Sequence, residues 1–437
     1  MTMATPNDTY NRSLERMFNL RRFGIRLGLD TIQSLLAGLQ NPQDNFSSIH
    51  IAGTNGKGSI AATLSAILQA AGYTVGLYTS PHLVRFNERI CINQAPISDA
   101  DVLTAYRAVN LDQHARREPT FFEYTTAMAL YEFSRKKVDW AVIETGMGGR
   151  LDATNIIKPA ITIISNVSIE HRQHLGNTIA RIAREKGGII KAQTPVITGV
   201  KQPSAIEVIT KIAADRSAPL YLHGKAFKTV RNRNGTFNYH GIETIWHNLK
   251  TVLAGRFQVD NAALVLAACE ILNSQNLAAI PFESIRTGFT QTKWPGRLEI
   301  VTTAPLVILD GAHNRAAAQN LGAHLHENLK GRRLTLVVGI LDDKPYKTML
   351  KSLLPHCSRA IITRPRIDRG LAPEKLYDFA KEILSDVVIL PDVDTAVTTA
   401  IESASPQDAV CIAGSLYVVG EAKETLATKK HLTVNKN

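Results

Sequence analysis

Cysteine is scarce in this chain, with four residues among 437, and no two of them are spaced as a CxxC pair. Zinc sites and disulfide frameworks both need closely and regularly spaced cysteines, so the sequence excludes them and favours a reducing cytoplasm. Long apolar runs are lacking as well. The longest nearly apolar stretch, Ala262–Leu272, is far shorter than the ~20 residues that cross a bilayer. The N-terminus also lacks a basic segment followed by an apolar core, so we expect neither a signal peptide nor a membrane segment.

Aromatic residues and clustered charge are also in short supply. Aromatic side chains make up 6% of the chain, and no run of five or more Lys or Arg occurs, although these residues outnumber Asp and Glu by 50 to 38. Nucleic-acid grooves need clustered basic and aromatic side chains, so the dispersed net charge of +12 indicates small anionic substrates and no nucleic-acid partner. What is present, 44% hydrophobic and 20% charged residues, is ordinary globular composition. The length predicts two or three domains.

Short apolar runs alternate with segments of helical period in the first part of the chain. The runs predict buried strands at Tyr73–Thr79, Val138–Glu144, Ala160–Asn166 and Pro195–Val200. Between and around them, helices are expected over 59–72, 99–116 and 123–134, the first ending at Gly72 as its C-terminal cap. Strands that alternate with helices are typical of βαβ units, so we expect a mostly parallel sheet.

A second series of the same kind begins near Leu306, with strands expected at 306–310, 334–339, 359–363, 387–390 and 409–413. The turn-rich Lys293–Arg297 lies between the two series and is the candidate linker. We therefore predict an α/β protein of two domains: residues 1–297 form a parallel-sheet ATPase domain with a phosphate loop, and residues 298–437 form a smaller Rossmann-like domain. The polar stretch Arg231–Gly241 predicts a hairpin with an Asn-Gly turn.

The segment Ile49–Ser59, IHIAGTNGKGS, is the most informative in the chain. An apolar run enters a loop with three glycines, and a helical pattern follows at once. Glycines let backbone N–H groups approach phosphate oxygens, and the helix N-terminus adds the positive end of its dipole. The strict GxxxxGK[ST] pattern is not met, because position 51 is Ile and Gly58 separates Lys57 from Ser59. The alternative is a tight structural turn, but the sequence favours a nucleotide loop made by Thr54, Asn55, Gly56, Lys57, Gly58 and Ser59.

This loop and its flanking segments resemble the folylpolyglutamate synthase/dihydrofolate synthase family of the Mur ligase superfamily. The resemblance covers about residues 25 to 421 in the family's order. Besides GTNGKGS, the similar segments are LGLDTIQSLL (Leu27–Leu36), YTSPHLVRFNERI (Tyr78–Ile90), FFEYTTAMAL (Phe121–Leu130), ETGMGGRLDATN (Glu144–Asn155), HLGNTIARIAREKGGIIK (His174–Lys191), GRFQVDNAALVLAA (Gly255–Ala268), WPGRLE (Trp294–Glu299), LDGAHN (Leu309–Asn314) and AGSLYVVGE (Ala413–Glu421).

The resemblance implies an ATP-dependent ligase that joins L-glutamate to dihydropteroate or to folyl glutamates through an acyl phosphate. It implies ATP, two Mg²⁺ ions and a monovalent cation as cofactors. Ser59, Ser80 and Glu144 would serve the first metal, and His171 the second. Lys186 matches a lysine that is carbamylated in the family, so that it becomes a carboxylate-like metal ligand. Lys57, Lys186 and His171 are thus the expected catalytic residues.

Each of these positions also has an ordinary structural interpretation. Glu144 could be a cap or a solvated group, His171 a satisfied structural residue, and Lys186 a solvated helix lysine paired with Glu185. The sequence also departs from the family at two places. It has Glu170 before His171 where the family often has Asp, and Gly187 where the family often has Ala.

For the nucleotide, the resemblance assigns Asn261 and Arg297, together with Asp310 and His313 from the second domain, which would complete the nucleotide and glutamate site. Asn314 is expected to N-cap the helix that follows Asp310. For the acid and amino-acid substrates, the resemblance implies Phe122, Asp152 and Ser415. The alternatives are a surface arginine at 297 and a core phenylalanine at 122.

Three functions compete at this stage. The first is a bifunctional dihydrofolate synthase/folylpolyglutamate synthase, with a monofunctional folylpolyglutamate synthase as its alternative. The second is a cell-wall amino-acid ligase of the Mur type, which the LGL, SPHL and LDATN segments disfavour. The third is a regulatory P-loop NTPase or transport ATPase. We expect the folate ligase, acting on dihydropteroate, reduced folates and L-glutamate as a cytoplasmic monomer.

Overall fold

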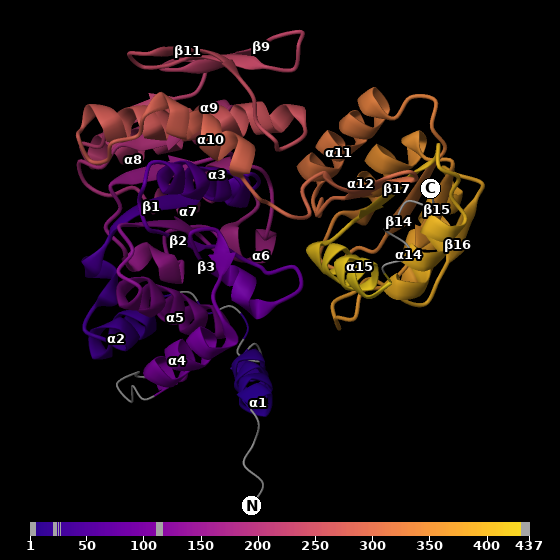
Figure 1. The fold of residues 1–437 in the computed structure, drawn as a ribbon, viewed down its shortest axis with the longest axis horizontal. Helices are drawn as coiled ribbons and strands as arrows, with labels where there is room; N and C mark the ends of the chain where they lie inside the picture. Colours follow the sequence, from indigo (N-terminus) through magenta and orange to yellow (C-terminus); the bar gives the residue numbers. More distant parts are fainter. Residues whose placement is uncertain (1–5, 21–23, 25, 27, 111–116, 430–437) are drawn as a thin grey trace, which may run out of the picture. The chain divides into compact units, whose positions relative to one another are not determined.

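The computed structural model describes residues 6–20, 24, 26, 28–110 and 117–429 (Figure 1). They divide into two compact units. The first comprises residues 1–82, 86–252 and 259–293, and the second comprises residues 83–85, 253–258 and 294–437, apart from the residues not described. Figure 1 draws the first unit from indigo through magenta toward orange and the second mainly in orange and yellow. The predicted boundary between Arg297 and Leu298 falls close to the start of the last segment of the second unit.

An eight-stranded, mostly parallel sheet is the frame of the first unit. Its strand order is β4-β3-β2-β5-β1-β6-β7-β8, and only β3 and β4, at one edge, run antiparallel to their neighbours. The strands are β1 (Ser47–Ala52), β2 (Val75–Tyr78), β3 (Ile90–Ile92), β4 (Ala95–Pro96), β5 (Trp140–Glu144), β6 (Ile161–Ile164), β7 (Val196–Thr198) and β8 (Leu220–Leu222). The central position of β1 places the loop that follows it in the middle of the sheet's carboxyl edge.

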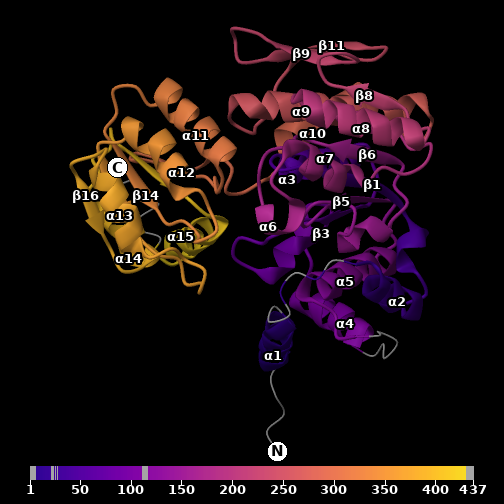
Figure 2. The ribbon, with the colours of Figure 1, turned by 180° about the vertical axis from the view of Figure 1, so that it is seen from behind.

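Helices cover both faces of this sheet (Figures 1 and 2). Ile49, Ile51 and Val142 point to one face, where they pack in a common core with helices α3, α9 and α10. Ala141 and Ile143, one position out of step, point to the other face and the core of α1, α2, α4 and α5. The helices are α1 (Pro6–Asn19), α2 (Asp30–Gly38), α3 (Lys57–Ala70), α4 (Asp99–Asn110), α5 (Phe121–Arg135), α6 (Arg172–Leu175), α7 (Ile179–Gly187), α8 (Pro203–Asp215), α9 (Arg256–Ser274) and α10 (Phe282–Gln291).

A small antiparallel sheet lies over α9, as both views show (Figures 1 and 2). It contains β9 (Lys228–Arg231), β10 (Phe237–His240) and β11 (Ile245–Leu249) in the order β11-β10-β9. Glu270 of α9 fixes the β10–β11 turn, because its carboxylate accepts hydrogen bonds from the Tyr239 hydroxyl, the backbone N–H groups of residues 242–244 and the Thr244 hydroxyl, at 2.6–2.9 Å.

The second unit is built around a six-stranded sheet with the order β12-β13-β17-β14-β15-β16, in which only the edge strand β12 is antiparallel. Its strands are β12 (Glu299–Thr303), β13 (Leu306–Leu309), β14 (Leu334–Val338), β15 (Arg359–Ile362), β16 (Val387–Ile389) and β17 (Ala409–Ala413). Its helices are α11 (Arg315–Asn328), α12 (Tyr346–Leu353), α13 (Pro373–Lys381), α14 (Val393–Glu402) and α15 (Leu416–Thr428). Separate apolar cores lie on the two faces of the sheet.

The α/β class and both strand series are confirmed, with β17 as predicted and the other strands one to three residues shorter. The helix expected over 99–116 is observed as α4, and residues 111–116, like Leu27 of the LGL segment, lie outside the described residues. Helix α3 begins at Lys57 rather than Ser59, so Gly58 belongs to its first turn. The Asn-Gly hairpin is present, but its loop spans residues 232–236 and is longer than a two-residue turn. In the part of the chain that the structure describes, no helix is long and apolar enough to cross a membrane.

Candidate active site

The loop between β1 and α3 makes a tight turn that only glycine fits at two positions. Gly53 has φ +152°, and a Cβ there would lie 1.8 Å from the Ser165 hydroxyl oxygen. Gly56 has φ +88°, and a Cβ there would lie 2.5 Å from Oδ1 of Asn261 on α9. These two glycines therefore bring the loop against the end of β6 and against α9, which places Asn261 beside the nucleotide loop as the resemblance implies.

The end of β6 holds the loop in place through residues that sequence reasoning missed. The Ser165 hydroxyl and the Asn166 side-chain amide both donate to the carbonyl of Asn55, at 2.6 and 2.8 Å. Asn166 Oδ1 in turn accepts from the Asn55 N–H at 3.0 Å, and the Thr54 hydroxyl accepts from the N–H of Ser168, also at 3.0 Å. The sequence signal that could have identified these residues is the abrupt change from the apolar run at 161–164 (ITII) to the polar segment at 165–168 (SNVS).

Lys57, Glu144 and Ser80 meet at the carboxyl edge of the sheet. The Lys57 ammonium donates to the carbonyl of Gly53 at 3.0 Å, and it lies 3.8 Å from the Glu144 carboxylate. Glu144 ends β5, is 5% exposed, and accepts from the N–H of Ser80 at 3.2 Å. Ser59 lies buried in the first turn of α3. The carboxyl edge of the sheet thus brings together the lysine, the carboxylate and the two serines predicted for phosphate and metal binding. Parallel α/β sheets bind their ligands at this edge.

Lys186 is buried on α7, with 1% of its surface exposed, and its ammonium lies 2.7 Å from the Glu170 carboxylate. The pairing with Glu185 that sequence alone allowed is not observed, because Glu185 pairs with Arg150 instead. Burial lowers the pKa of Lys186, although Glu170 opposes the shift. Burial alone would raise the pKa of Glu170, but the charges of Lys186 and Lys57 outweigh it and lower that pKa to about 2. A lowered pKa increases the fraction of a buried lysine that is a neutral amine, which is the form that carbamylation requires.

His171 follows Glu170 in a left-handed backbone conformation, with φ +43°, and its side chain is exposed at the start of α6. Among the described residues, no three His, Cys, Asp or Glu side chains gather as a metal cluster. Mg²⁺ is commonly held by one or two carboxylates together with waters and substrate phosphates, so such a cluster is not required. Glu144, with Ser59 and Ser80 as hydroxyl donors, provides the hard oxygen chemistry that this ion prefers.

Phe122 and Asp152, predicted for substrate binding, both contact the segment Gly146–Met147. The Phe122 ring packs on Gly146, where a Cβ would lie 2.4 Å from it, and its centroid is 6.1 Å from that of Tyr78. Asp152 is 6% exposed and accepts from the N–H of Met147 at 2.8 Å. Residues 145–152, here called the substrate loop, therefore connect an aromatic face with a buried carboxylate.

The substrate loop is clamped to α7 by the Arg150 N–H, which donates to the carbonyl of Glu185 at 2.7 Å, by the Asn155 side chain and by close packing at two glycines. Asn155 donates from its side-chain amide to the carbonyls of Arg150 and Gly188, at 3.0 and 3.1 Å. A Cβ on Gly149 would lie 2.8 Å from the carbonyl of Glu185, and one on Gly188 would lie 2.3 Å from Arg150. This clamp, formed by Gly149, Arg150, Asn155 and Gly188, fixes Asp152 relative to the helix that carries Lys186.

In the second unit, Arg297, Asp310 and His313 come together around Gly311. A Cβ on Gly311 would lie 2.3 Å from Nη1 of Arg297, and the carbonyl of Gly311 lies 2.8 Å from Nδ1 of His313. Asp310 accepts from the N–H groups of Leu298 and Ala312, both at 2.9 Å. Burial raises its pKa, while Arg297 and these two donors act against the rise.

Two helices of this unit begin next to these residues. Asn314 N-caps α11 by accepting from the N–H of Ala317 at 2.9 Å, which confirms the predicted cap. Ser415 is buried and N-caps α15, and the side chain of the next residue, Leu416, abuts Gly311. The structure therefore gathers the predicted residues of the second unit at the carboxyl edge of its own sheet.

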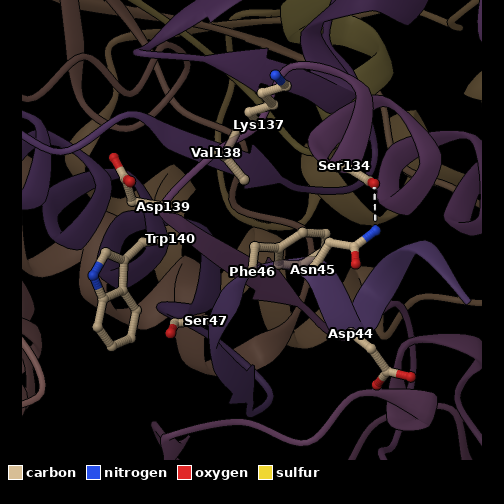
Figure 3. A pocket seen from close by; sticks show the side chains of 9 residues that line it. All are labelled: Asp44, Asn45, Phe46, Ser47, Ser134, Lys137, Val138, Asp139 and Trp140. Atoms are coloured by element: carbon tan, nitrogen blue, oxygen red, sulfur yellow. Dashed lines mark hydrogen bonds between the residues drawn. The ribbon is translucent and has the colours of Figure 1, made fainter.

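A hollow of about 860 Å³ lies at the amino ends of β1 and β5 (Figure 3). It is lined by Asp44, Asn45, Phe46, Ser47, Ser134, Lys137, Val138, Asp139 and Trp140. This edge is opposite to the one that carries the phosphate loop and Glu144. In parallel α/β sheets ligands bind at the carboxyl ends of strands, so the hollow is not part of the candidate active site.

Comparison with known proteins agrees with this geometry. The Mur ligase middle domain model matches residues 51–269, and the Mur ligase glutamate ligase domain model matches residues 296–416. A dihydrofolate synthase/folylpolyglutamate synthase from Bacillus subtilis is 37% identical over 415 residues, which cover 93% of this chain and 96% of the relative.

Two solved structures are similar over nearly their whole length. E. coli FolC in complex with DHPP and ADP has a TM-score of 0.88 and 28% identity, with 96% of this chain and 98% of that chain covered. A bifunctional folylpolyglutamate synthase/dihydrofolate synthase from Yersinia pestis, complexed with AMPPNP and a Mn ion, has a TM-score of 0.87 and 30% identity, with 98% and 100% covered. These neighbours bind a nucleotide, and one of them also binds a divalent metal.

Proposed function

Because the chain belongs to the folylpolyglutamate synthase/dihydrofolate synthase family of the Mur ligase superfamily and is an ATP-dependent ligase, we propose that it joins L-glutamate to dihydropteroate and to reduced folyl glutamates. The proposal is supported above all by the meeting of Lys57, Glu144 and Ser80 at the carboxyl edge of the first unit's sheet. The neighbouring substrate loop, with Phe122 and Asp152, supports a pterin-bearing acid as the substrate.

The nucleotide's phosphates would lie against the loop of residues 53–59. Its backbone N–H groups and the N-terminus of α3 offer donors and a positive dipole to phosphate oxygens. Lys57 would exchange the carbonyl of Gly53 for a phosphate oxygen, since its ammonium already lies within the loop. Asn261 would position the nucleotide from α9. Arg297, Asp310 and His313 stay predictions for nucleotide binding, and Ser415 for glutamate.

Mg²⁺ would be held by Glu144, Ser59 and Ser80, and a second ion by His171 and a carbamylated Lys186. When bound, the ions neutralise phosphate oxygens during phosphoryl transfer. Burial on α7 and the adjacent Lys57 charge favour the neutral amine of Lys186 that reacts with CO₂. Glu170 would then have to release its ion pair with Lys186 before the carbamate forms.

In the proposed reaction, the carboxylate of the pteroate or folate attacks the γ-phosphorus of ATP and displaces ADP. The amino group of L-glutamate then attacks the acyl phosphate, loses a proton, and displaces inorganic phosphate as the amide forms. This chain's residues contribute position and charge: Lys57 stabilises the anionic transferring group, and the substrate loop orients the acid. The free, widely spaced cysteines support a cytoplasmic setting, and the resemblance implies a monomer.

The test is a pair of turnover assays with ATP and L-glutamate, one supplying dihydropteroate and the other tetrahydrofolate. We expect ADP release to require both glutamate and the acid in each assay. Turnover with tetrahydrofolate alone would show the monofunctional folylpolyglutamate synthase instead. If ADP release does not depend on L-glutamate, the proposed substrates are wrong, and the result favours a regulatory NTPase.

A further inference from the structure

A chain of three buried polar side chains runs from the centre of the sheet to the substrate loop. His50 of β1 is fully buried and lies on the strand face opposite to Ile49 and Ile51. Its Nε2 is 2.8 Å from the hydroxyl of Thr154, and that hydroxyl is 2.6 Å from Oδ1 of Asp152. Thr154 is fully buried and Asp152 is 6% exposed, so the chain lies in the interior of the protein.

The donors around Asp152 define the direction of this chain. Oδ1 accepts from the N–H of Thr154 at 3.1 Å, and Oδ2 accepts from the N–H of Met147 at 2.8 Å. Burial raises the pKa of Asp152, but the backbone donors on both oxygens oppose that rise and favour the carboxylate form, which can only accept. The single proton of the Thr154 hydroxyl is then donated to Asp152. The hydroxyl oxygen must therefore accept from Nε2–H of His50.

The other ring nitrogen of His50 agrees with this direction. Nδ1 is buried and has no hydrogen-bond partner within the described residues, as suits an unprotonated nitrogen better than a buried N–H. Burial and the charge of Lys191 lower the pKa of His50 to about 3. His50 thus stays neutral at the pH where cytoplasmic enzymes work, and its donor role does not change with pH.

We propose that Thr154 and His50 are positioning residues for the acid substrate: they orient the Asp152 carboxylate and, through its bond to Met147, fix the substrate loop on which Phe122 packs. The inference rests on the proposed function, because it takes residues 145–152 as the place where the pteroate or folate lies. Neither Thr154 nor His50 is expected to touch the substrate, so their effect should fall on the affinity for the acid and not on ATP.

The test compares Thr154→Val with wild type by steady-state kinetics, varying dihydropteroate and ATP in turn. Valine keeps the shape of threonine but removes the hydroxyl, so Asp152 loses one donor and keeps its two backbone N–H donors, while His50 loses its acceptor. We expect KM for dihydropteroate to rise about tenfold, because small displacements of a positioning group cost large factors, while KM for ATP and kcat change less than about twofold. Thr154→Ser restores the hydroxyl and should return KM to near the wild-type value.

Thr198→Val is the matched control. Thr198 is also buried, and its hydroxyl both donates to the carbonyl of Ile164 at 3.0 Å and accepts from the N–H of Val200 at 3.3 Å. Its loss should lower stability without a selective change in KM for dihydropteroate. The inference is supported if KM for dihydropteroate rises at least about fivefold more than KM for ATP in Thr154→Val and not in Thr198→Val. If KM for dihydropteroate rises less than this relative to KM for ATP in Thr154→Val, the inference is overturned.

A second measurement does not depend on catalysis. In ¹⁵N-histidine NMR of the wild-type protein, with His50 assigned by His50→Asn, we expect a proton on Nε2 and none on Nδ1. A proton on Nδ1 would overturn the chain of hydrogen bonds. If wild type itself shows no glutamate-dependent turnover, the proposed function fails, while the NMR result still decides the direction of the chain.

Discussion

Replacement of Lys57 by methionine separates catalysis from folding. In the structure the ammonium makes one good hydrogen bond, to the carbonyl of Gly53 at 3.0 Å, and a longer one of 3.5 Å to Thr54. It also pairs with Glu144 at 3.8 Å. A hydrogen bond of this kind contributes about 1 kcal/mol. The Glu144 side chain is 6% exposed, so loss of the ion pair leaves a buried carboxylate that keeps its bond from the Ser80 N–H but loses its cation, at a further cost of about 1–3 kcal/mol. The variant should therefore unfold about 2–4 kcal/mol more easily than wild type.

The variant that remains folded should also lose rate. A preorganised donor aimed at charge that develops in the transition state is worth roughly 10²–10³ in kcat, or about 2.7–4 kcal/mol. We expect Lys57→Met to lose at least about a hundredfold in kcat for ADP release with both dihydropteroate and tetrahydrofolate. Methionine retains the apolar stem of lysine, so the contacts of the side chain with the loop change little.

Lys429→Met is the control for the loss of one paired lysine. Lys429 is the C-cap residue that follows α15, and it pairs with Asp394 at 2.7 Å, outside the candidate site. The Lys429→Met variant should lose little stability and keep wild-type kcat. Urea unfolding measures the free energy of unfolding, and a coupled ADP assay measures kcat. If Lys57→Met keeps more than about a tenth of wild-type kcat, a deficit of only ~1.4 kcal/mol, the phosphate role assigned to Lys57 is wrong.

Two further predictions concern buried charges. Lys186→Arg keeps a cation beside Glu170 and should stay folded, yet it cannot be carbamylated, so activity should collapse; an active Arg variant would rule out the carbamate. Lys186→Ala leaves Glu170 buried and unpaired at a cost of about 3–5 kcal/mol, and a short carboxylic acid in the buffer should partly restore its activity if it folds. Glu270→Gln places an amide against N–H donors and should lower stability by about 3 kcal/mol in urea unfolding. Burial acts to raise the pKa of Glu270, but the hydrogen bonds outweigh burial and lower that pKa. The contribution of the ionised carboxylate to the free energy of unfolding is therefore present above the unfolded pKa of about 4.3 and is lost as pH falls below it. A stability difference between variant and wild type that persists undiminished at pH 2 would refute this account.

The strands and the phosphate loop were predictable because their signals are local. Apolar runs of four to seven residues could hardly be anything but buried strands, and a glycine-rich turn before a helix has few other uses. The start of α3 was missed by two residues because glycine lowers helix propensity, although Gly58 lies in the first turn, where packing decides. The small sheet β9–β11 was only partly predicted, since its stability depends on Glu270, some thirty residues further along the chain.

For the candidate site, the sequence identified residues but not their partners. The resemblance pointed to Lys186, but only the fold shows that it pairs with Glu170 rather than with Glu185, its neighbour in sequence. His50 could not be distinguished from an ordinary strand residue, because its role depends on Thr154, which is 104 positions away. Residue types and spacing therefore predict which chemistry is available, whereas hydrogen-bond partners across the sheet require the three-dimensional structure.

The clamp between the substrate loop and α7 bears on how such an enzyme can diversify. Gly149 packs against the carbonyl of Glu185 and Gly188 packs against the Cα and Cβ of Arg150, and neither position has room for a side chain. A substitution that reshapes the loop to admit a new acid would therefore also shift Lys186, and would slow the reaction with every acid at once. We therefore expect substitutions that change the choice of acid to be better tolerated on α5, where Phe122 packs against Gly146 of the loop, than at the clamp.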